Sequence, residues 1–80
     1  MRKKILITGG SGYLGRNLAK NLKNKYLVYL GSRNNLRNDL AKHETGCEAF
    51  PLDVANINSV LDAVNYVKPD IIIHAAATKF

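Results

Sequence analysis

The feature that most constrains this chain is a glycine-rich segment at residues 8–15, TGGSGYLG, which separates two kinds of apolar pattern. Before it, residues 5–7 form an apolar run without polar alternation, which predicts a strand covered on both faces. After it, leucines recur every four residues from position 14 to position 22, which predicts an amphipathic helix that ends near Asn24. A tight glycine turn that joins a buried strand to a helix is typical of α/β domains.

Three later segments predict further strands. Residues 26–30 are aromatic and aliphatic, and we expect this strand to stop at Gly31. Residues 47–52 predict a strand in which Pro51 lies near the end, where its missing N–H is not needed. Residues 71–73 are again continuously apolar, so we expect a strand covered on both faces.

The segments between these strands predict helices. Leu36 and Leu40 lie four residues apart in a polar stretch, which favours a short helix before Gly46. A second helix is predicted between the capping residue Asn56 and Pro69, because the apolar residues follow helical spacing at positions 57, 60, 61, 64 and 67. Alternating strands and helices predict a single Rossmann-like half-domain over residues 1–80, with about four parallel strands and helices on both faces.

Composition narrows the classes of partner. Eighty residues, 46% hydrophobic and 22% charged, fit one small globular domain. The net charge of +6 could attract nucleic acid, an acidic membrane or a small anion, but the basic residues do not cluster as nucleic-acid recognition requires. The single cysteine, Cys47, has no disulfide or metal-binding partner, and no apolar run approaches the length of a membrane span. We therefore expect a cytoplasmic protein without a nucleic-acid or membrane partner.

The glycine segment has the spacing of a dinucleotide-binding turn. It satisfies GxGxxG through Gly10, Gly12 and Gly15, and it also satisfies TGxxGxxG from Thr8 onward. Gly12 would let the backbone meet a pyrophosphate, Gly15 would let the helix pack near the sheet, and the free N–H groups at the helix start would bind phosphate. The competing interpretation is a turn needed only for packing; the strand before it and the helix after it favour the dinucleotide site.

The same segment nearly matches a second phosphate-binding loop, GxxxxGK[ST], which is found in NTPases. Arg16 stands where that loop needs a lysine that reaches the terminal phosphates, and Asn17 stands where it needs a hydroxyl that binds magnesium. Because both chemical positions differ, the sequence argues against an NTPase.

The residues after the second predicted strand bear on which dinucleotide is bound. An NAD site places an acidic residue there for the adenosine ribose, whereas an NADP site places a basic residue there for the 2′-phosphate. In this chain Ser32 and Arg33 occupy that position, and no carboxylate is present. Arg33 could make charge-assisted hydrogen bonds to the 2′-phosphate and Ser32 could donate another, so we predict NADP in preference to NAD. The alternative for Arg33 is a solvated loop residue.

Four segments together resemble an extended short-chain dehydrogenase/reductase of the NAD-dependent epimerase/dehydratase type. They are the glycine turn, Arg33, the LDV sequence at residues 52–54 and the PDIIIHAAA sequence at residues 69–77. The resemblance covers nearly the whole chain and is greatest to enzymes that act on nucleotide sugars, namely epimerases, 4,6-dehydratases and dehydrorhamnose reductases.

The resemblance implies roles for residues beyond the turn. Asp53 would bind the adenine amino group with Val54 beside the ring, although Asp53 could equally be a turn or helix-capping residue. Small residues at positions 75–77 would line the cofactor between ribose and nicotinamide, and His74 would form a structural hydrogen bond rather than act in catalysis or metal binding. The candidate cofactor-binding residues are Gly9, Ser11, Gly12, Tyr13, Leu14, Gly15, Ser32, Arg33, Asp53, Val54, Ala75, Ala76 and Ala77.

The chain departs from the family at its catalytic pair. These enzymes resemble one another in a Tyr-x-x-x-Lys motif, but none of the four tyrosines here is followed by lysine at that spacing. Three hypotheses follow. The chain is the NADP(H)-binding, N-terminal part of a nucleotide-sugar oxidoreductase, epimerase or dehydratase that is inactive alone; or it is a stand-alone nucleotide-binding or regulatory module; or it is a relic without binding. A C-terminal half or a second copy of the chain would be the partner that completes the site.

Overall fold

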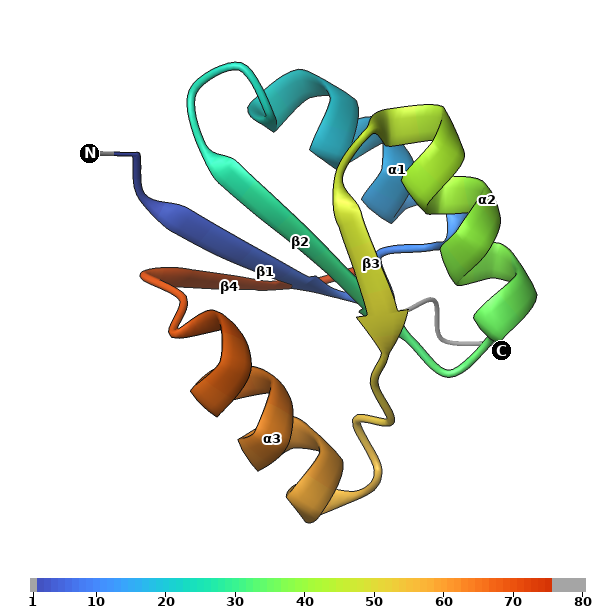
Figure 1. The fold of residues 1–80 in the computed structure, drawn as a ribbon, viewed down its shortest axis with the longest axis vertical. Helices are drawn as coiled ribbons and strands as arrows, with labels where there is room; N and C mark the ends of the chain where they lie inside the picture. The colour runs from blue at the N-terminus through green and yellow to red at the C-terminus, as the bar shows by residue number, and fades with distance from the viewer. Residues whose placement is uncertain (1, 76–80) are drawn as a thin grey trace.

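A four-stranded parallel sheet forms the centre of the computed structural model, which describes residues 2–75 (Figure 1). The strand order is β3-β2-β1-β4, with β1 at Lys4–Thr8, β2 at Leu27–Ser32, β3 at Glu48–Pro51 and β4 at Ile71–His74. The chain starts in the middle of the sheet, winds outward through β2 and β3, and then crosses to the other side of β1. This arrangement confirms the predicted α/β class and the predicted Rossmann-like parallel sheet of four strands.

Helices cover both faces of the sheet, as predicted. Figure 1 shows α1 (Tyr13–Leu22) and α2 (Asn35–Thr45) on one face and α3 (Ile57–Val67) on the other. Ala19 of α1 and Ala41 of α2 are fully buried against the first face, whereas Ala63 and Val67 of α3 are buried against the second. None of the helices in the described part of the chain is long and apolar enough to cross a membrane.

β1 is the strand covered on both faces that the sequence predicts. Ile5 and Ile7 point into the cluster beneath α1 and α2, and Leu6 points into the cluster beneath α3. All three side chains are at most 2% exposed. The central position of β1 fixes the glycine turn that follows it between the two helical layers.

The ends of α2 and α3 follow the predicted capping residues. Asn56 accepts hydrogen bonds from the backbone N–H groups of Asn58 and Ser59, so α3 begins where the sequence places it. Gly46 adopts φ 74° directly after α2, which confirms its role as the helix stop. Asn34 caps the start of α2 by accepting from the N–H of Arg37.

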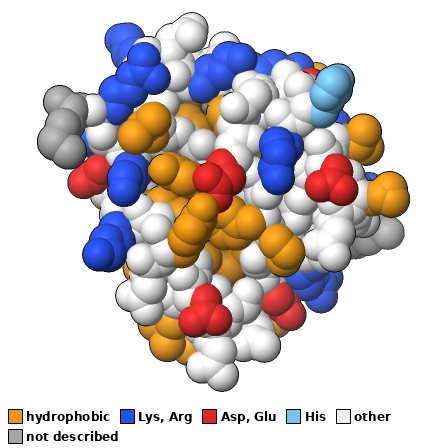
Figure 2. Space-filling view, viewed as in Figure 1, with side chains coloured by type: hydrophobic (Ala, Val, Ile, Leu, Met, Phe, Trp, Pro, Cys, Tyr) orange, Lys and Arg blue, Asp and Glu red, His pale blue; other side chains and the backbone are white. Residues whose placement is uncertain are grey.

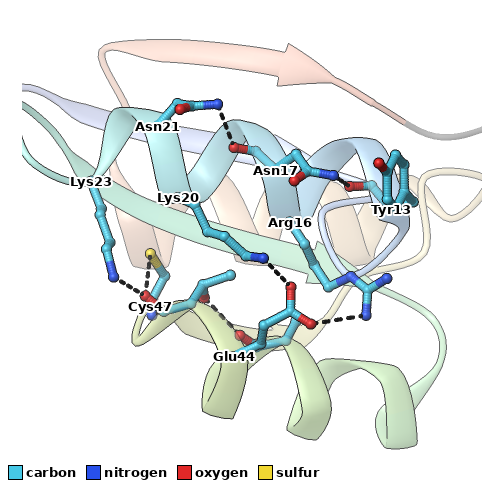
Figure 3. A network of polar contacts seen from close by, with 10 residues as sticks. Tyr13, Arg16, Asn17, Lys20, Asn21, Lys23, Glu44 and Cys47 are labelled. Atoms are coloured by element: carbon cyan, nitrogen blue, oxygen red, sulfur yellow. Dashed lines mark hydrogen bonds and ion pairs between the residues drawn. The ribbon is translucent and has the colours of Figure 1, made fainter.

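Polar contacts join the first two helices (Figure 3). Lys20 Nζ lies 2.8 Å from Glu44 Oε2, and Arg16 Nη1 lies 3.5 Å from Glu44 Oε1. Lys23 Nζ also donates to the backbone oxygen of Thr45, over 2.9 Å. Because the three basic residues lie on α1 or directly after it and both acceptors lie at the end of α2, these contacts hold the two helices side by side.

β2 is longer than predicted, whereas β3 ends at the predicted proline. β2 does not stop at Gly31 but continues to Ser32, since Gly31 pairs with Thr8 and Phe50 within the sheet. A Cβ at Gly31 would lie 2.6 Å from a methyl carbon of Leu52, so the glycine makes room for that side chain rather than ending the strand. Pro51 lies at the end of β3, an edge strand, as predicted.

β4 is not covered on both faces, contrary to the prediction. Ile71 is 40% exposed and Ile72 is 53% exposed. β4 lies at the edge of the sheet, and the strand residues that pack in the cluster beneath α3 come from the other three strands (Leu6, Tyr29 and Phe50). An apolar run predicts burial only when a neighbouring layer extends over it.

The packed face of α2 is formed by small and polar residues and not by its leucines. Leu36 and Leu40 are 67% and 59% exposed, whereas Asn38, Ala41 and Thr45 are buried. Small side chains at positions 41 and 45 let the helix approach the sheet closely. Because successive residues of an α-helix are rotated by about 100°, the two leucines then face outward.

Phe50 and Tyr66 line a groove between β3 and α3. Figure 2 shows apolar side chains gathered near the middle of the face in view.

Candidate functional site

A cleft of ≈ 1070 Å³ opens at the carboxyl ends of the strands, the end to which the arrowheads point in Figure 1. Ligands of open α/β sheets bind at this edge, next to the position where the strand order reverses, which here is between β1 and β4. The cleft brings together ten of the sequence-predicted site residues: Gly9, Ser11, Gly12, Tyr13, Leu14, Ser32, Arg33, Asp53, Val54 and Ala75.

The glycine turn is fixed to the neighbouring strand by backbone hydrogen bonds. The N–H groups of Gly9 and Gly10 both donate to the carbonyl of Gly31, over 2.7 and 3.1 Å. Gly9 adopts φ 69°, a left-handed conformation that glycine enters without a steric penalty. The chain can therefore leave β1 sharply and remain attached to the end of β2.

The other glycines of the turn divide into packing and open positions. A Cβ at Gly10 would lie 2.8 Å from both the Ile7 oxygen and a Leu30 methyl carbon, and a Cβ at Gly15 would lie 2.4 Å from Gly10 Cα. Gly15 thus packs the helix against the turn, not against a strand, and does not line the cleft. At Gly12 the nearest atom would be the Gly9 oxygen at 3.4 Å, so the backbone here borders open space.

The start of α1 leaves backbone donors available at the cleft. Gly12 is the N-cap residue and provides no side-chain hydrogen bond, and the first turn has no acidic residue. Tyr13 and Leu14 line the cleft and are 79% and 58% exposed. The first N–H groups of a helix have no intrahelical acceptor and lie at the positive end of its dipole, so this end of the cleft suits an anion.

Two arginines line the part of the cleft that lies beyond β2. Arg33 follows the strand directly, and Arg37 lies on the first turn of α2; both side chains are exposed. Ser32 occupies the strand end, where an NAD site would place a carboxylate. Asp53, the acidic residue of the cleft lining, follows β3 instead.

A buried side-chain network lies beneath this part of the cleft. The Ser11 and Ser32 hydroxyls are hydrogen-bonded to each other, and the Ser32 hydroxyl donates to Asn38 Oδ1 over 2.9 Å. Asn38 Nδ2 in turn donates to the Ser32 carbonyl oxygen over 3.0 Å. The network therefore joins the glycine turn, the end of β2 and α2, and it involves the hydroxyl that the sequence suggested as a phosphate donor.

Asp53 forms the turn contacts that its simpler interpretation predicts. Its Oδ1 accepts from the N–H of Ala55 over 3.0 Å, and its own N–H donates to the Ser59 hydroxyl over 2.9 Å. The helix cap is Asn56 rather than Asp53. Val54 is 47% exposed and lines the cleft beside Asp53, which leaves an apolar surface there for a flat ring.

His74 forms a hydrogen bond with a neighbouring strand, which is the role the sequence favoured. Its Nδ1 lies 2.6 Å from Thr8 Oγ1, so the ends of β4 and β1 are joined by side chains as well as by backbone. Ala75 follows directly, is 8% exposed and donates its N–H to the Thr8 oxygen. The predicted cofactor contacts of Ala76 and Ala77 lie outside the described residues.

The sequence also matches a family model, "NAD dependent epimerase/dehydratase family", over residues 5–80. The chain belongs to this family. Members of the NAD dependent epimerase/dehydratase family use NAD(P) and bind this dinucleotide as a cofactor. The resemblance on which the sequence prediction rests is therefore confirmed at the level of the family, whereas the individual contacts to the cofactor stay predictions. No curated protein matches the chain.

Solved structures support the same assignment of the fold. A short chain dehydrogenase from Bacillus anthracis matches with a TM-score of 0.85 and 26% identity over 98% of this chain and 36% of its own. The TT0495 protein from Thermus thermophilus matches with a TM-score of 0.77 and 30% identity, over 100% of this chain and 34% of its own. Menthone neomenthol reductase from Mentha piperita matches with a TM-score of 0.83 and 23% identity, over 98% of this chain and 32% of its own. This last match shows a likeness of fold alone. The chain spans about a third of the length of these structures.

Within the family site, the structure adds residues that the sequence analysis missed. Arg37 and Asn34 line the cleft, and Asn38 lies beneath it. Arg37 could have been found from the predicted helix, because the first turn of a helix that follows β2 lies at the carboxyl edge of the sheet, close to Arg33. Asn38 carried no comparable signal, since a polar residue within a polar helix is typical of a solvated face.

Proposed function

We propose that the chain binds NADP(H) in this cleft and forms the cofactor-binding part of an enzyme that acts on a nucleotide sugar, as an epimerase, dehydratase or reductase. Membership of the NAD dependent epimerase/dehydratase family supports the dinucleotide. Preference for NADP is supported by the arginines next to β2. The class of substrate is supported by the HAAA sequence at residues 74–77, which resembles that of the nucleotide-sugar enzymes.

One observation carries the preference for NADP. Arg33 and Arg37 both line the cleft beyond the end of β2, and Ser32 stands where a carboxylate would select NAD. A 2′-phosphate at that position would meet two guanidinium groups, each able to form charge-assisted hydrogen bonds. A carboxylate there would repel the phosphate, and none is present at the strand end.

The other predicted residues give the cofactor a continuous path. The pyrophosphate would lie at Gly12 and the first N–H groups of α1, where the open glycine lets it approach the backbone. The adenine ring would lie against Val54 with its amino group at Asp53. The nicotinamide end would run past Ala75 toward Ala76 and Ala77, which lie outside the described residues.

We propose that these 80 residues bind the cofactor but do not catalyse alone. Oxidoreductases and epimerases of this type need a proton donor and acceptor, and no tyrosine in the sequence has the lysine partner that would lower its pKa. A second candidate function is a nucleotide-binding module completed by a partner, which the exposure of Ile71 and Ile72 on the edge strand favours.

Titration of the full chain with NADPH and with NADH tests the proposal. We expect tighter binding of NADPH, and we expect Arg33→Ala to weaken NADPH binding by about tenfold while changing NADH binding by less than about twofold, since one hydrogen bond to a charged group is lost. Arg2→Ala is the matched control, because Arg2 is exposed at the opposite end of the strands. Tighter binding of NADH, or an equal effect of the two substitutions, would contradict the preference for NADP.

A further inference from the structure

Asn38 has both ends of its amide group occupied by a single residue of the cleft lining. The side chain is 3% exposed and lies on the face of α2 that packs against the sheet. Its Nδ2 donates to the Ser32 carbonyl oxygen, and its Oδ1 accepts from the Ser32 hydroxyl. Since the carbonyl oxygen can only accept, the amide orientation is determined, and the atom that faces the hydroxyl must be the oxygen.

This orientation determines where the hydroxyl hydrogens of the network point. Ser32 has one hydroxyl hydrogen, and Asn38 Oδ1 receives it over 2.9 Å. In the hydrogen bond between the two serines, Ser11 is therefore the donor and Ser32 the acceptor. Both serines line the cleft, but neither has a hydroxyl hydrogen left for a ligand there.

We propose that Asn38 is a positioning residue that lowers selectivity for NADP(H) by holding the Ser32 hydroxyl hydrogen away from the 2′-phosphate. The proposal rests on the proposed function, which places that phosphate beside Ser32 and Arg33. With its hydrogen donated to Asn38, Ser32 presents only lone-pair density to the cleft. Such an oxygen can accept from a ribose hydroxyl but adds nothing favourable to a phosphate, so the arginines provide all of the attraction.

The end of β2 keeps its position without Asn38, which makes the effect on selectivity separable from an effect on folding. The Ser32 carbonyl oxygen also accepts from the N–H of Leu52 over 2.9 Å, and the Gly31 carbonyl accepts from the glycine turn. Truncation of Asn38 therefore releases the Ser32 hydroxyl while the strand end stays hydrogen-bonded on both sides. The released hydroxyl can turn toward the cleft and donate to an anion.

A double-mutant cycle on the full chain tests the proposal, with the ratio of NADPH to NADH affinity as the readout. Ser32→Ala alone should not lower the ratio, because the hydroxyl does not donate to the phosphate. Asn38→Ala should raise it by about tenfold, the size of one new hydrogen bond to a charged group. Adding Ser32→Ala to Asn38→Ala should remove that gain. Asn65→Ala, at an exposed position of α3, is the matched control and should leave the ratio unchanged.

The outcomes separate this proposal from the proposed function. A ratio that falls by about tenfold in Ser32→Ala alone would show that Ser32 already donates to the phosphate, and it would overturn the proposal even if Asn38→Ala fails to fold. A ratio that Asn38→Ala leaves unchanged would overturn it as well. Wild-type protein that binds neither dinucleotide would overturn the proposed function and this proposal with it. Loss of stability without a change of ratio would assign Asn38 a structural role only.

Discussion

Gly10 and Gly15 pack backbone against backbone, so that a Cβ added to Gly15 would lie 2.4 Å from Gly10 Cα and 2.6 Å from the Gly10 oxygen. This contact sets the distance between the glycine turn and α1. Since the turn is itself hydrogen-bonded to the Gly31 carbonyl of β2, the same contact fixes the start of α1 relative to the sheet.

Gly15→Ala should therefore destabilise the fold. The added methyl group would meet backbone atoms that cannot rotate away, and α1 would have to shift from the turn. We expect a loss of about 1–3 kcal/mol in the free energy of unfolding, the usual cost of overpacking at a rigid site. Urea unfolding followed by circular dichroism measures it, and a stability equal to that of the wild type would contradict the assigned packing.

Gly12→Ala provides the complementary prediction. Its φ of −77° suits alanine, and the nearest atom to the new Cβ would be the Gly9 oxygen at 3.4 Å, so we expect stability to change by less than about 0.5 kcal/mol. Dinucleotide binding should nevertheless weaken by at least about tenfold, because the methyl group would occupy the space of the pyrophosphate. Normal binding by this variant would place the pyrophosphate elsewhere.

The elements of this fold were predictable where local signals agree. Three local signals predicted elements that the structure confirms. They are the apolar run of β1, the asparagine that caps α3 and the glycine that ends α2. The glycine turn could likewise be assigned, because its spacing has meaning only between a strand and a helix.

The sequence did not show which side chains are buried or in contact where packing between distant elements determines this. Leu36 and Leu40 predict the helix α2 but not its buried face, because burial follows the small residues Ala41 and Thr45, which allow a closer approach to the sheet. Ile71 and Ile72 predict a covered strand, but coverage depends on a layer that those residues do not themselves specify. The contacts of Asn38 depend on the side-by-side arrangement of β2 and α2, which no local pattern encodes.

The contact between α1 and α2 predicts a dependence of stability on acid pH. The hydrogen bond from Lys20, together with the charges of Arg16 and Lys20, lowers the pKa of Glu44 below its ordinary value of 4.5. A carboxyl group with a lowered pKa in the folded state contributes stability above its unfolded pKa and loses that contribution as the pH falls through the folded value. The advantage of wild type over Glu44→Gln should thus be present at neutral pH and disappear in acid.

Thermal unfolding of both proteins across that pH range measures the effect. Because the three side chains are partly exposed, we expect the difference to be small and to shrink in high salt. Asp39→Asn, at an exposed position of the same helix, is the matched control. A difference between wild type and Glu44→Gln that is independent of pH would contradict a role for the carboxylate charge.

The groove between β3 and α3 predicts an opposite dependence at alkaline pH. The hydrogen bond that Tyr66 donates to Glu48, followed by the charge of that carboxylate, raises the pKa of Tyr66 above its ordinary value of 10.0. This contact contributes stability below the unfolded pKa and loses it as the pH rises through the folded value. Phenolate absorbance should show Tyr66 ionising at higher pH in wild type than in Glu48→Gln, and identical titrations would contradict the contact.

Dinucleotide binding at the carboxyl edge of the sheet underlies every role proposed for this cleft, and the backbone amide resonances of the full chain test it most directly. On addition of NADPH we expect the largest chemical-shift changes at Gly12, Tyr13 and Leu14, the residues at the open start of α1. Residues at the opposite end of the strands, such as Val28 and Cys47, should remain unshifted. Changes confined to that opposite end, or no changes anywhere at saturating NADPH, would contradict the account.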